Sequence, residues 1–374
     1  MSRTATSGFV EYDGFSAELV KLLVSVWSAS GTYPHDAPVD NRPRPQPHGL
    51  RPIPGEAQMD EIVCANTAFR YWRCPPQVRD LYPRLPNSEE GWRALSQAPF
   101  VTDVLKTPII AVASPGCCNH HSGLRSSIRW EGASDAGTTI DTHLGFSVTN
   151  PLNTLFTMTR FVSQIDLVLA MYELCGWFSV FEPTPAAEMQ LKMAVEENRN
   201  SNTQDLFELG EGEDDVPWKR VYARTTVKVP ANEGQTNNRE DGREVTKLKG
   251  TSLWMRKPLI ELSDLHRFAE KVKSQMWGKQ FYDAAQQVIG IAASPLEVAG
   301  VLLLSRSRRL GGAGFRYVYL NDLTPLSMAA QSIAGQKVCY GDIVIVNPIL
   351  MKAVIIEIQG EVIHGSGAIL DHDA

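Results

Sequence analysis

The sequence predicts an α/β protein (α+β overall), in which a region of mixed helices and strands precedes a better organised C-terminal α/β core. Three observations predict this class. Segments with helical periodicity alternate with short apolar runs rich in Val, Ile and Thr. Helix signals after Ser263 are followed by two apolar runs, at 342–346 and 353–359, and helix followed by paired strands is an α/β arrangement. The 374 residues are enough for two or three domains.

Shifts in composition divide the chain into four regions. An amphipathic helix is expected at 14–29, and the stretch 34–54 holds seven prolines, which indicates a linker because proline removes donors and fixes φ. The expected regions are an N-terminal helix and linker, a mixed α/β region, a polar and partly disordered insertion, and a final region of helices and strands, at 1–58, 59–183, 184–250 and 251–374.

Within these regions several elements can be placed. A short helix is expected to end before Pro75, strands are expected at 108–113 and 143–148, and the apolar segment 151–178 reads as one helical core segment with Phe161 on its buried face. Little of 184–250 can bury apolar area, apart from one hairpin around 218–229. Ser263 and Ser294 are expected to cap helices, with another helix near 279–289.

Composition and charge limit the cellular location and the class of partner that we expect for this chain. Net charge is −6, which argues mildly against a nucleic-acid protein, but the charge is uneven: six acids lie in 205–215, and 306–316 holds four arginines and no acid. The N-terminus has no export signal, no apolar run reaches the ~18 residues that a membrane helix needs, and the six cysteines form no C-x-x-C pair. We therefore expect a soluble, cytoplasmic protein without a membrane partner.

The C-terminal residues hold the strongest candidate site. Asp342 opens one apolar strand, and Glu357 and Gln359 lie two apart near the end of the next, which puts them on one face. If the strands pair, Asp342 and Glu357 can hold one Mg²⁺ (or Mn²⁺), with His364 as proton shuttle and Glu297 completing the acidic cluster.

These carboxylates also have structural interpretations. Ser294-Pro295-Leu296-Glu297 is a well-formed capping box, in which Glu297 reaches back to the helix start. Asp342 follows a glycine, as turn residues often do, and an edge strand would accommodate Glu357 without any function.

Residues 292–374 resemble the very-short-patch-repair-type endonucleases and their relatives in the PD-(D/E)xK nuclease superfamily. The matching segments are ASPLE at 293–297, RRLGG at 308–312, GDIVIV at 341–346 and VIIEIQGEVIH at 354–364. The resemblance implies a restriction-endonuclease-like α/β core, Mg²⁺-dependent hydrolysis of DNA phosphodiesters, and a set of functional positions at Glu297, Asp342, Glu357, Gln359, Gly360 and His364.

This sequence departs from the family pattern in two ways. Gln359 stands where relatives usually carry Lys or Asp, and the chain ends at Ala374, ten residues after His364, whereas the family core continues with another strand and a helix. We therefore expect an incomplete module with weak or no cleavage. Residues 59–181 resemble bacterial regions of the abortive-infection antitoxin regulator type that precede such nucleases, which implies a regulatory role and leaves a toxin-like partner open.

Three other motifs invite a functional interpretation. The Cys117–His121 cluster lacks the ligand spacing of a zinc site and is read as a chance loop cluster. Gly311–Gly314 lacks the Lys-Ser/Thr of a phosphate-binding loop and is read as a turn. The arginines beside it could contact a DNA backbone or form a solvated helix end: Arg306, Arg308 and Arg309.

The sequence thus predicts a DNA-acting, metal-dependent endonuclease-like hydrolase, with a non-catalytic antitoxin-like regulator or DNA-binding protein as the alternative. Gln359 and the early end of the chain favour the alternative, and the pair Asp342 and Glu357 favours the enzyme.

Overall fold

The structure is a computed structural model. It describes residues 62–85, 92–113, 123–130, 137–200, 218–229, 243–325, 328, 331–332, 337–350 and 352–358. The chain divides into two compact units, Met1–Gly55 and Glu56–Ala374. Every described residue belongs to the second unit, so the helix expected at 14–29 and the proline-rich stretch lie outside the described residues. Helices and mixed sheets occur together, which confirms the α/β class.

The first sheet has five strands in the order β3-β2-β1-β5-β4. β1 pairs antiparallel with β2 and parallel with β5, β2 pairs parallel with β3, and β4 pairs antiparallel with β5. The strands are short: Ile62–Val63, Ile109–Val112, Arg125–Ile128, Thr139–Asp141 and Ser147–Thr149 for β1 to β5. β2 confirms the strand expected at 108–113, whereas the strand expected at 143–148 begins only at Ser147.

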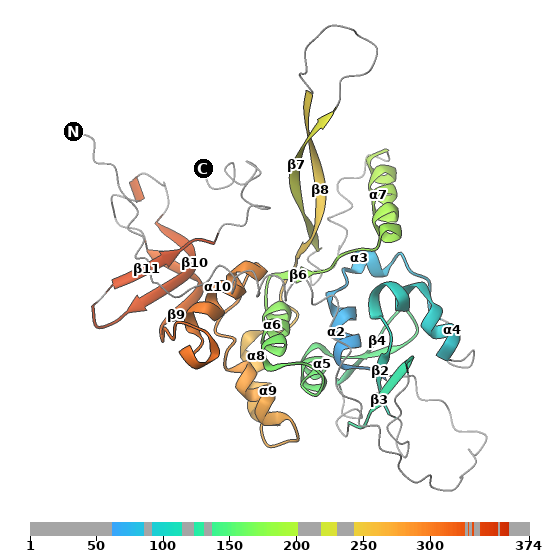
Figure 1. The fold of residues 1–374 in the computed structure, drawn as a ribbon, viewed down its shortest axis with the longest axis horizontal. Helices are drawn as coiled ribbons and strands as arrows, with labels where there is room; N and C mark the ends of the chain where they lie inside the picture. The colour runs from blue at the N-terminus through green and yellow to red at the C-terminus, as the bar shows by residue number, and fades with distance from the viewer. Residues whose placement is uncertain are drawn as a thin grey trace. The chain divides into compact units, whose positions relative to one another are not determined.

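Helix α2 (Ala65–Arg73) lies beside this sheet and ends before Pro75 as expected, because Cys74 is extended. Short helical segments follow it along the same region (Figure 1): α3 (Pro76–Arg79), α4 (Trp92–Gln97) and a π-helical turn at Val101–Leu105. Together with the sheet they enclose one apolar core that includes Phe100, Leu105 and Val148.

The apolar segment 151–178 forms two helices rather than one, α5 (Pro151–Met158) and α6 (Gln164–Cys175). The break has a local cause, because Ser163 caps α6 by accepting a hydrogen bond from the Asp166 N–H. Phe161 lies in this break and is 39% exposed, so its expected place on the buried face was wrong.

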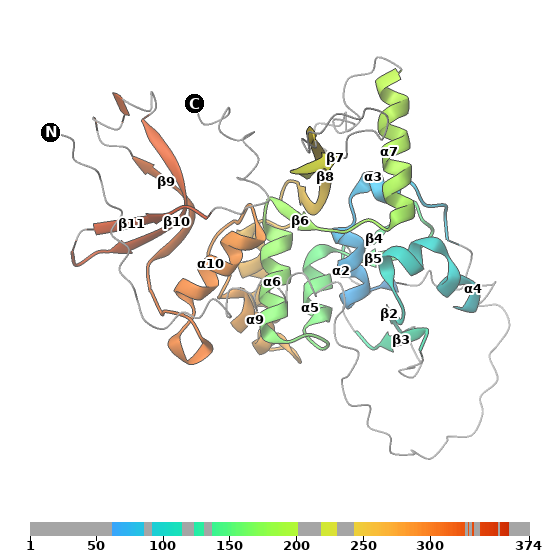
Figure 2. The same ribbon diagram turned by 45° about the horizontal axis from the view of Figure 1, so that its top comes forward.

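A second sheet, in the order β6-β8-β7, rises from the end of α6. β6 (Phe178–Val180) pairs with only the last residues of β8 (Arg243–Met255). β7 (Lys219–Val229) pairs with β8 along its length, and the two form a ribbon that extends past β6 (Figure 1). The hairpin expected around 218–229 is therefore confirmed. The expectation of little regular structure across 184–250 was wrong for these strands and for α7 (Pro185–Asn200), which stands beside the ribbon in Figure 2.

Three helices lead into the third sheet: α8 (Leu262–Val272), α9 (Gly278–Ala285) and α10 (Pro295–Ser305). The cap residue of α8 is Glu261 rather than the expected Ser263, which lies inside the helix, whereas Ser294 caps α10 as expected. Rings from α5, α8 and α9 pack edge to face at Phe156, Phe268 and Phe281.

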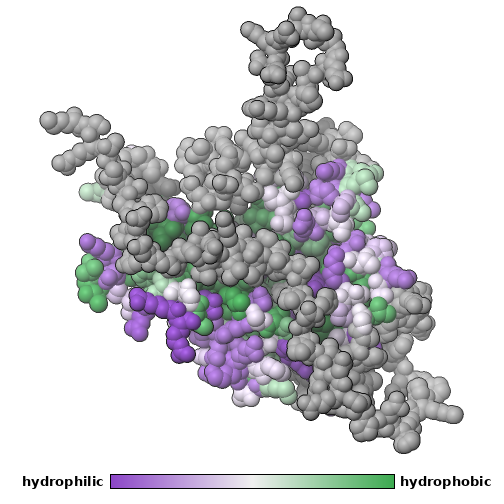
Figure 3. All heavy atoms as spheres, viewed as in Figure 1, coloured by the Kyte–Doolittle hydropathy of each residue, from purple (hydrophilic) through white to green (hydrophobic). Residues whose placement is uncertain are grey.

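The third sheet is an antiparallel meander in the order β11-β10-β9. β10 (Val338–Asn347) and β11 (Lys352–Ile356) confirm the two predicted strands as neighbours, although β11 ends one residue before Glu357. β9 (Val318–Pro325) was not predicted. Figure 3 shows hydrophobic surface at its far left. Ile349, which lies between β10 and β11 in the chain, is 90% exposed. No helix among the described residues is long and apolar enough to cross a membrane.

Candidate functional site

Glu297 sits in the first turn of α10 and is buried, with 6% of its surface exposed. Its Oε1 accepts a hydrogen bond from Ser294 Oγ at 2.8 Å, and its Oε2 accepts from the Ala293 N–H at 2.8 Å. Ser294 Oγ in turn accepts from the Glu297 N–H at 3.2 Å. The capping interpretation of this glutamate is therefore confirmed.

A residue that the sequence did not single out, Asn321, joins Glu297 to the sheet. Its amide nitrogen donates to Glu297 Oε2 at 2.8 Å and to the Ile291 carbonyl at 2.9 Å. Asn321 has a positive φ of 47°, a conformation that asparagine adopts more readily than most residues. The β9–β10 pairing passes from Gly341–Asp322 to Ile343–Leu320, so Asn321 stands opposite Asp342 at an interruption of the ladder.

Asp342 is half-buried at this interruption. Its Oδ2 accepts a hydrogen bond from the Ile358 N–H at 2.7 Å, which fixes the carboxylate against the segment that follows β11. The last pair of the β10–β11 ladder is Ile343–Ile356, and one step further in that register position 342 comes opposite position 357. Position 342 and exposed Glu357 therefore lie one step beyond the last pair of the β10–β11 ladder, where the register would place them on one face.

The electrostatics join Glu297 to Asp342. Burial raises the pKa of Glu297 above its ordinary value, and the negative charge of Asp342 raises it further, against the three hydrogen bonds from Ala293, Asn321 and Ser294. Glu297 and Asp342 therefore lie close enough for their charges to interact. Glu297 already has three donors, so its role at this site is to position Asn321 and the start of α10.

The three predicted DNA-binding arginines have different environments. Arg306 ends α10, is half-buried, and donates from Nε to Gln287 Oε1 at 3.1 Å, while burial lowers the pKa of its guanidinium. Arg308 and Arg309 lie in a short 3₁₀ turn (Arg308–Leu310) and are exposed. Arg306 is therefore held inside the fold, and the other two face solvent.

Two predicted site residues, Gln359 and His364, lie outside the described residues, as does the Cys117–His121 cluster. Among the residues that the structure describes, no group of three or more His, Cys, Asp or Glu side chains could hold a metal ion. Within that part of the chain, a metal site at Asp342 and Glu357 consists of two carboxylates.

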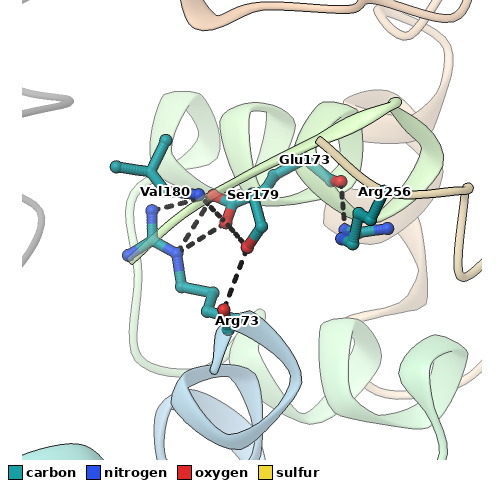
Figure 4. A network of polar contacts seen from close by, with 5 residues as sticks. All are labelled: Arg73, Glu173, Ser179, Val180 and Arg256. Carbon is teal, nitrogen blue, oxygen red and sulfur yellow. Dashed lines mark hydrogen bonds and ion pairs between the residues drawn. The ribbon is translucent and has the colours of Figure 1, made fainter. Parts of the chain in front are cut away.

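A buried charged network elsewhere was missed from the sequence (Figure 4). Arg73 of α2 forms a bidentate pair with Glu173 of α6, with Nε–Oε1 and Nη2–Oε2 both 2.8 Å. Ser179 Oγ and the Val180 N–H of β6 each lie 3.0 Å from Glu173 Oε1. Glu173 is 1% exposed. Glu173 lies in the apolar helix segment LVLAMYELC, where a charged side chain needs a partner. This was the sequence signal that could have predicted the network.

Arg256, at the end of β8, extends this network. It donates from Nη2 to the Glu173 carbonyl at 2.6 Å and from Nη1 to the Lys257 carbonyl at 2.8 Å, while its Nε has no partner among the described residues. Burial lowers the pKa of Arg256 to about 10, against the opposing charge of Glu173. The network ties α2, α6, β6 and β8 together, which is a structural role.

No protein-family model, no curated protein and no solved structure matches the chain.

Proposed function

We propose that this chain acts on DNA as a divalent-metal-dependent, endonuclease-like hydrolase with weak activity. The observation that supports the proposal is the β10–β11 register, whose continuation by one step beyond the Ile343–Ile356 pair would bring Asp342 opposite Glu357. The order of elements supports it as well, because α10 with Glu297 precedes the strand with Asp342 and the strand that leads to Glu357.

The side chains fit a hard cation. Mg²⁺ is bound through one or two carboxylates, with waters and substrate phosphates in the remaining positions. Asp342 and Glu357 would supply those carboxylates, and the Ile358 N–H holds Asp342 in place. Mg²⁺ or Mn²⁺ there would activate a water and offset the negative charge of a phosphodiester.

The chain's own residues would divide the remaining work. Asp342 and Glu357 orient the site, Glu297 assists by fixing Asn321 next to Asp342, and His364 would take a proton from the attacking water. Gln359 can hydrogen-bond to a phosphate but supplies no charge, which is one reason to expect slow cleavage.

A plasmid-nicking assay tests this proposal. We expect slow nicking that EDTA abolishes. Asp342→Asn or Glu357→Gln should lower the nicking rate by more than about 100-fold, because loss of a residue that only supports a metal ligand already costs up to about 100-fold, and these two would be direct ligands. Glu270→Gln, which removes an exposed carboxylate from α8, serves as the control and should cut like the parent. Nicking that survives both site substitutions would place the chemistry elsewhere.

A second function, non-catalytic DNA binding of the antitoxin-like regulator kind, is favoured by the β7–β8 ribbon. Its two strands hold seven basic residues and one acidic residue, in a chain of net charge −6. Arg243, Lys247 and Lys249 are the three basic residues of β8. A two-stranded ribbon fits the major groove of B-DNA, and its basic residues would neutralise phosphates. Duplex binding without any nicking would favour this second function over the first.

A further inference from the structure

The outer face of β9 exposes aromatic rings. Tyr317 is 40% exposed and Tyr319 is 43% exposed, while Val318 and Leu320 between and after them are 5% and 8% exposed. Phe315, two residues before Tyr317, is 41% exposed. The strand therefore buries its aliphatic residues and presents its aromatic ones, the reverse of a strand whose outer face is polar.

The register shows which face this is. Ile343 of β10 pairs with Leu320, and a Cβ on Gly300 of α10 would come within 2.8 Å of Ile343, so α10 covers the aliphatic face. Tyr319 pairs with Val344, which pairs with Ile355 on β11, so these three residues form a row on the opposite face. The Val346 N–H donates to the Tyr317 carbonyl at 2.9 Å, which continues the ladder to Tyr317.

The rings have no aromatic or cationic partner inside the described part of the chain. None of Phe315, Tyr317 and Tyr319 packs against another aromatic ring there, and no cation lies over them. Their faces are therefore not used by the fold in the way that the Phe156, Phe268 and Phe281 rings are.

The segment that carries the rings is basic in sequence. Arg308, Arg309 and Arg316 are exposed, and the sequence from 298 to 321 contains no acidic residue. Backbone bonds hold the connecting turn against the end of α10, with Ala313 N–H to the Leu303 carbonyl at 2.7 Å and Phe315 N–H to the Leu304 carbonyl at 2.9 Å. The arginines and the rings are thus presented by an ordered segment rather than a free loop.

We propose that this surface, Phe315, Tyr317 and Tyr319 with Arg308, Arg309 and Arg316, binds single-stranded DNA. Exposed rings beside cations are what a single strand requires, because unpaired bases stack on aromatic faces while phosphates bind arginine. A duplex offers base edges and phosphates but no open base faces, so it would use the arginines and leave the rings idle. The inference rests on the proposed DNA function and names its substrate, a DNA with a single-stranded part.

Fluorescence anisotropy with a labelled oligo(dT) tests this inference on the full chain, in EDTA so that no cleavage interferes. Tyr317→Ala and Tyr319→Ala should each weaken oligo(dT) binding about tenfold, and the double Tyr→Phe variant should bind like the parent because stacking is retained. Duplex binding should be unchanged in the tyrosine variants. Replacing the three arginines with glutamine should reduce the slope of log K against log[salt] by about 2 units.

Phe161→Ala is the matched control, because Phe161 is a similarly exposed ring in the α5–α6 connection. Tyr319 pairs with Val344 within the ladder, and Tyr317 precedes the strand. If Tyr319→Ala unfolds the chain, Tyr317→Ala therefore still tests whether the surface binds oligo(dT). Unchanged oligo(dT) binding in Tyr317→Ala would overturn the inference, and so would equal losses for duplex and single strand. A tyrosine-dependent dimer in sedimentation, without oligo(dT) binding, would instead assign the surface to a second copy of the chain.

The outcome is independent of cleavage. The binding measurement is made in EDTA and needs no cleavage, so a chain that never nicks DNA yet binds oligo(dT) through its tyrosines would refute the hydrolase and support this surface. A chain that nicks duplex plasmid but ignores oligo(dT) would do the reverse.

Discussion

At the scale of single residues, Glu297 combines a structural role with proximity to the candidate site. Its hydrogen bonds to Ser294 and the Ala293 N–H belong to the helix start, and its bond from Asn321 belongs to the sheet beside Asp342. The carboxylate therefore couples the start of α10 to the middle of β10, where Asp342 is a proposed metal ligand.

The raised pKa of Glu297 predicts a pH dependence of stability. Between the ordinary value of 4.5 and the raised folded value, the folded chain binds more protons than the unfolded chain, so the contribution of Glu297 to the free energy of unfolding falls as pH rises. Urea unfolding of the parent and of Glu297→Gln should show a stability difference that declines from pH 4.5 upward and then levels off. A difference that is constant or grows with pH contradicts this assignment.

The buried pair Arg73 and Glu173 predicts a second residue-scale effect. Glu173→Gln leaves the Arg73 charge buried without its counterion, which should cost about 3–5 kcal/mol of unfolding free energy. The double variant Arg73→Met with Glu173→Leu should cost less than the sum of the single changes, because Arg73 is no longer left as a buried charge without its counterion. Denaturant melts measure both, and a loss below about 1 kcal/mol for Glu173→Gln would show that the pair contributes little.

At the scale of elements, the sequence predicted those whose signals are local. The Ser-Pro-x-Glu start of α10 and the apolar runs of β10 and β11 are each contained within a few residues. β9 was missed because Val318, Tyr319 and Leu320 are followed at once by Asn321 and Asp322, which are depleted in strands, and because its pairing with β10 is not visible in the strand itself. Asn321 was missed for the same reason, since its role arises from two elements that meet only in the fold.

The polar region 184–250 shows the limit of composition as a guide. α7 and the β7–β8 ribbon form within this polar region because their own sequences are about as apolar as the chain average of 43%. Specific contacts hold a basic side chain of the ribbon in place. Arg220 pairs with Glu188 of α7, lies over the Trp254 ring and donates to the Thr251 carbonyl at 2.8 Å. Such contacts join residues far apart in sequence, so no local sequence pattern predicts them.

The ribbon carries its own prediction. Replacing Arg243, Lys247 and Lys249 with glutamine should weaken duplex DNA binding and reduce the salt slope by about 3 units, since each phosphate contact contributes about 0.9. A control that removes the same charge from other elements, Lys192, Lys257 and Lys279 to glutamine, should leave the slope near the parent value. Gel-shift titrations from 50 to 200 mM salt measure it, and equal slopes in both variants would remove the ribbon from the DNA interface.

At the scale of the whole molecule, net charge was the least informative quantity. The chain is acidic overall, yet its acids concentrate in 205–215, while the ribbon and the segment 306–316 are basic. The structure assigns these basic segments to different elements, the ribbon of the second sheet and the turn between α10 and β9 of the third. The charge of individual segments is therefore compatible with the proposed DNA contact, although the net charge of the whole chain argues against it.

The central claim is that Asp342 and Glu357 hold one divalent cation, and Mn²⁺ titration followed by electron paramagnetic resonance tests it directly. The free Mn²⁺ signal should fall until about one ion per chain is bound, and the double variant Asp342→Asn with Glu357→Gln should bind none at the same concentrations. Glu270→Gln should bind like the parent. Undiminished Mn²⁺ binding by the double variant would contradict the account.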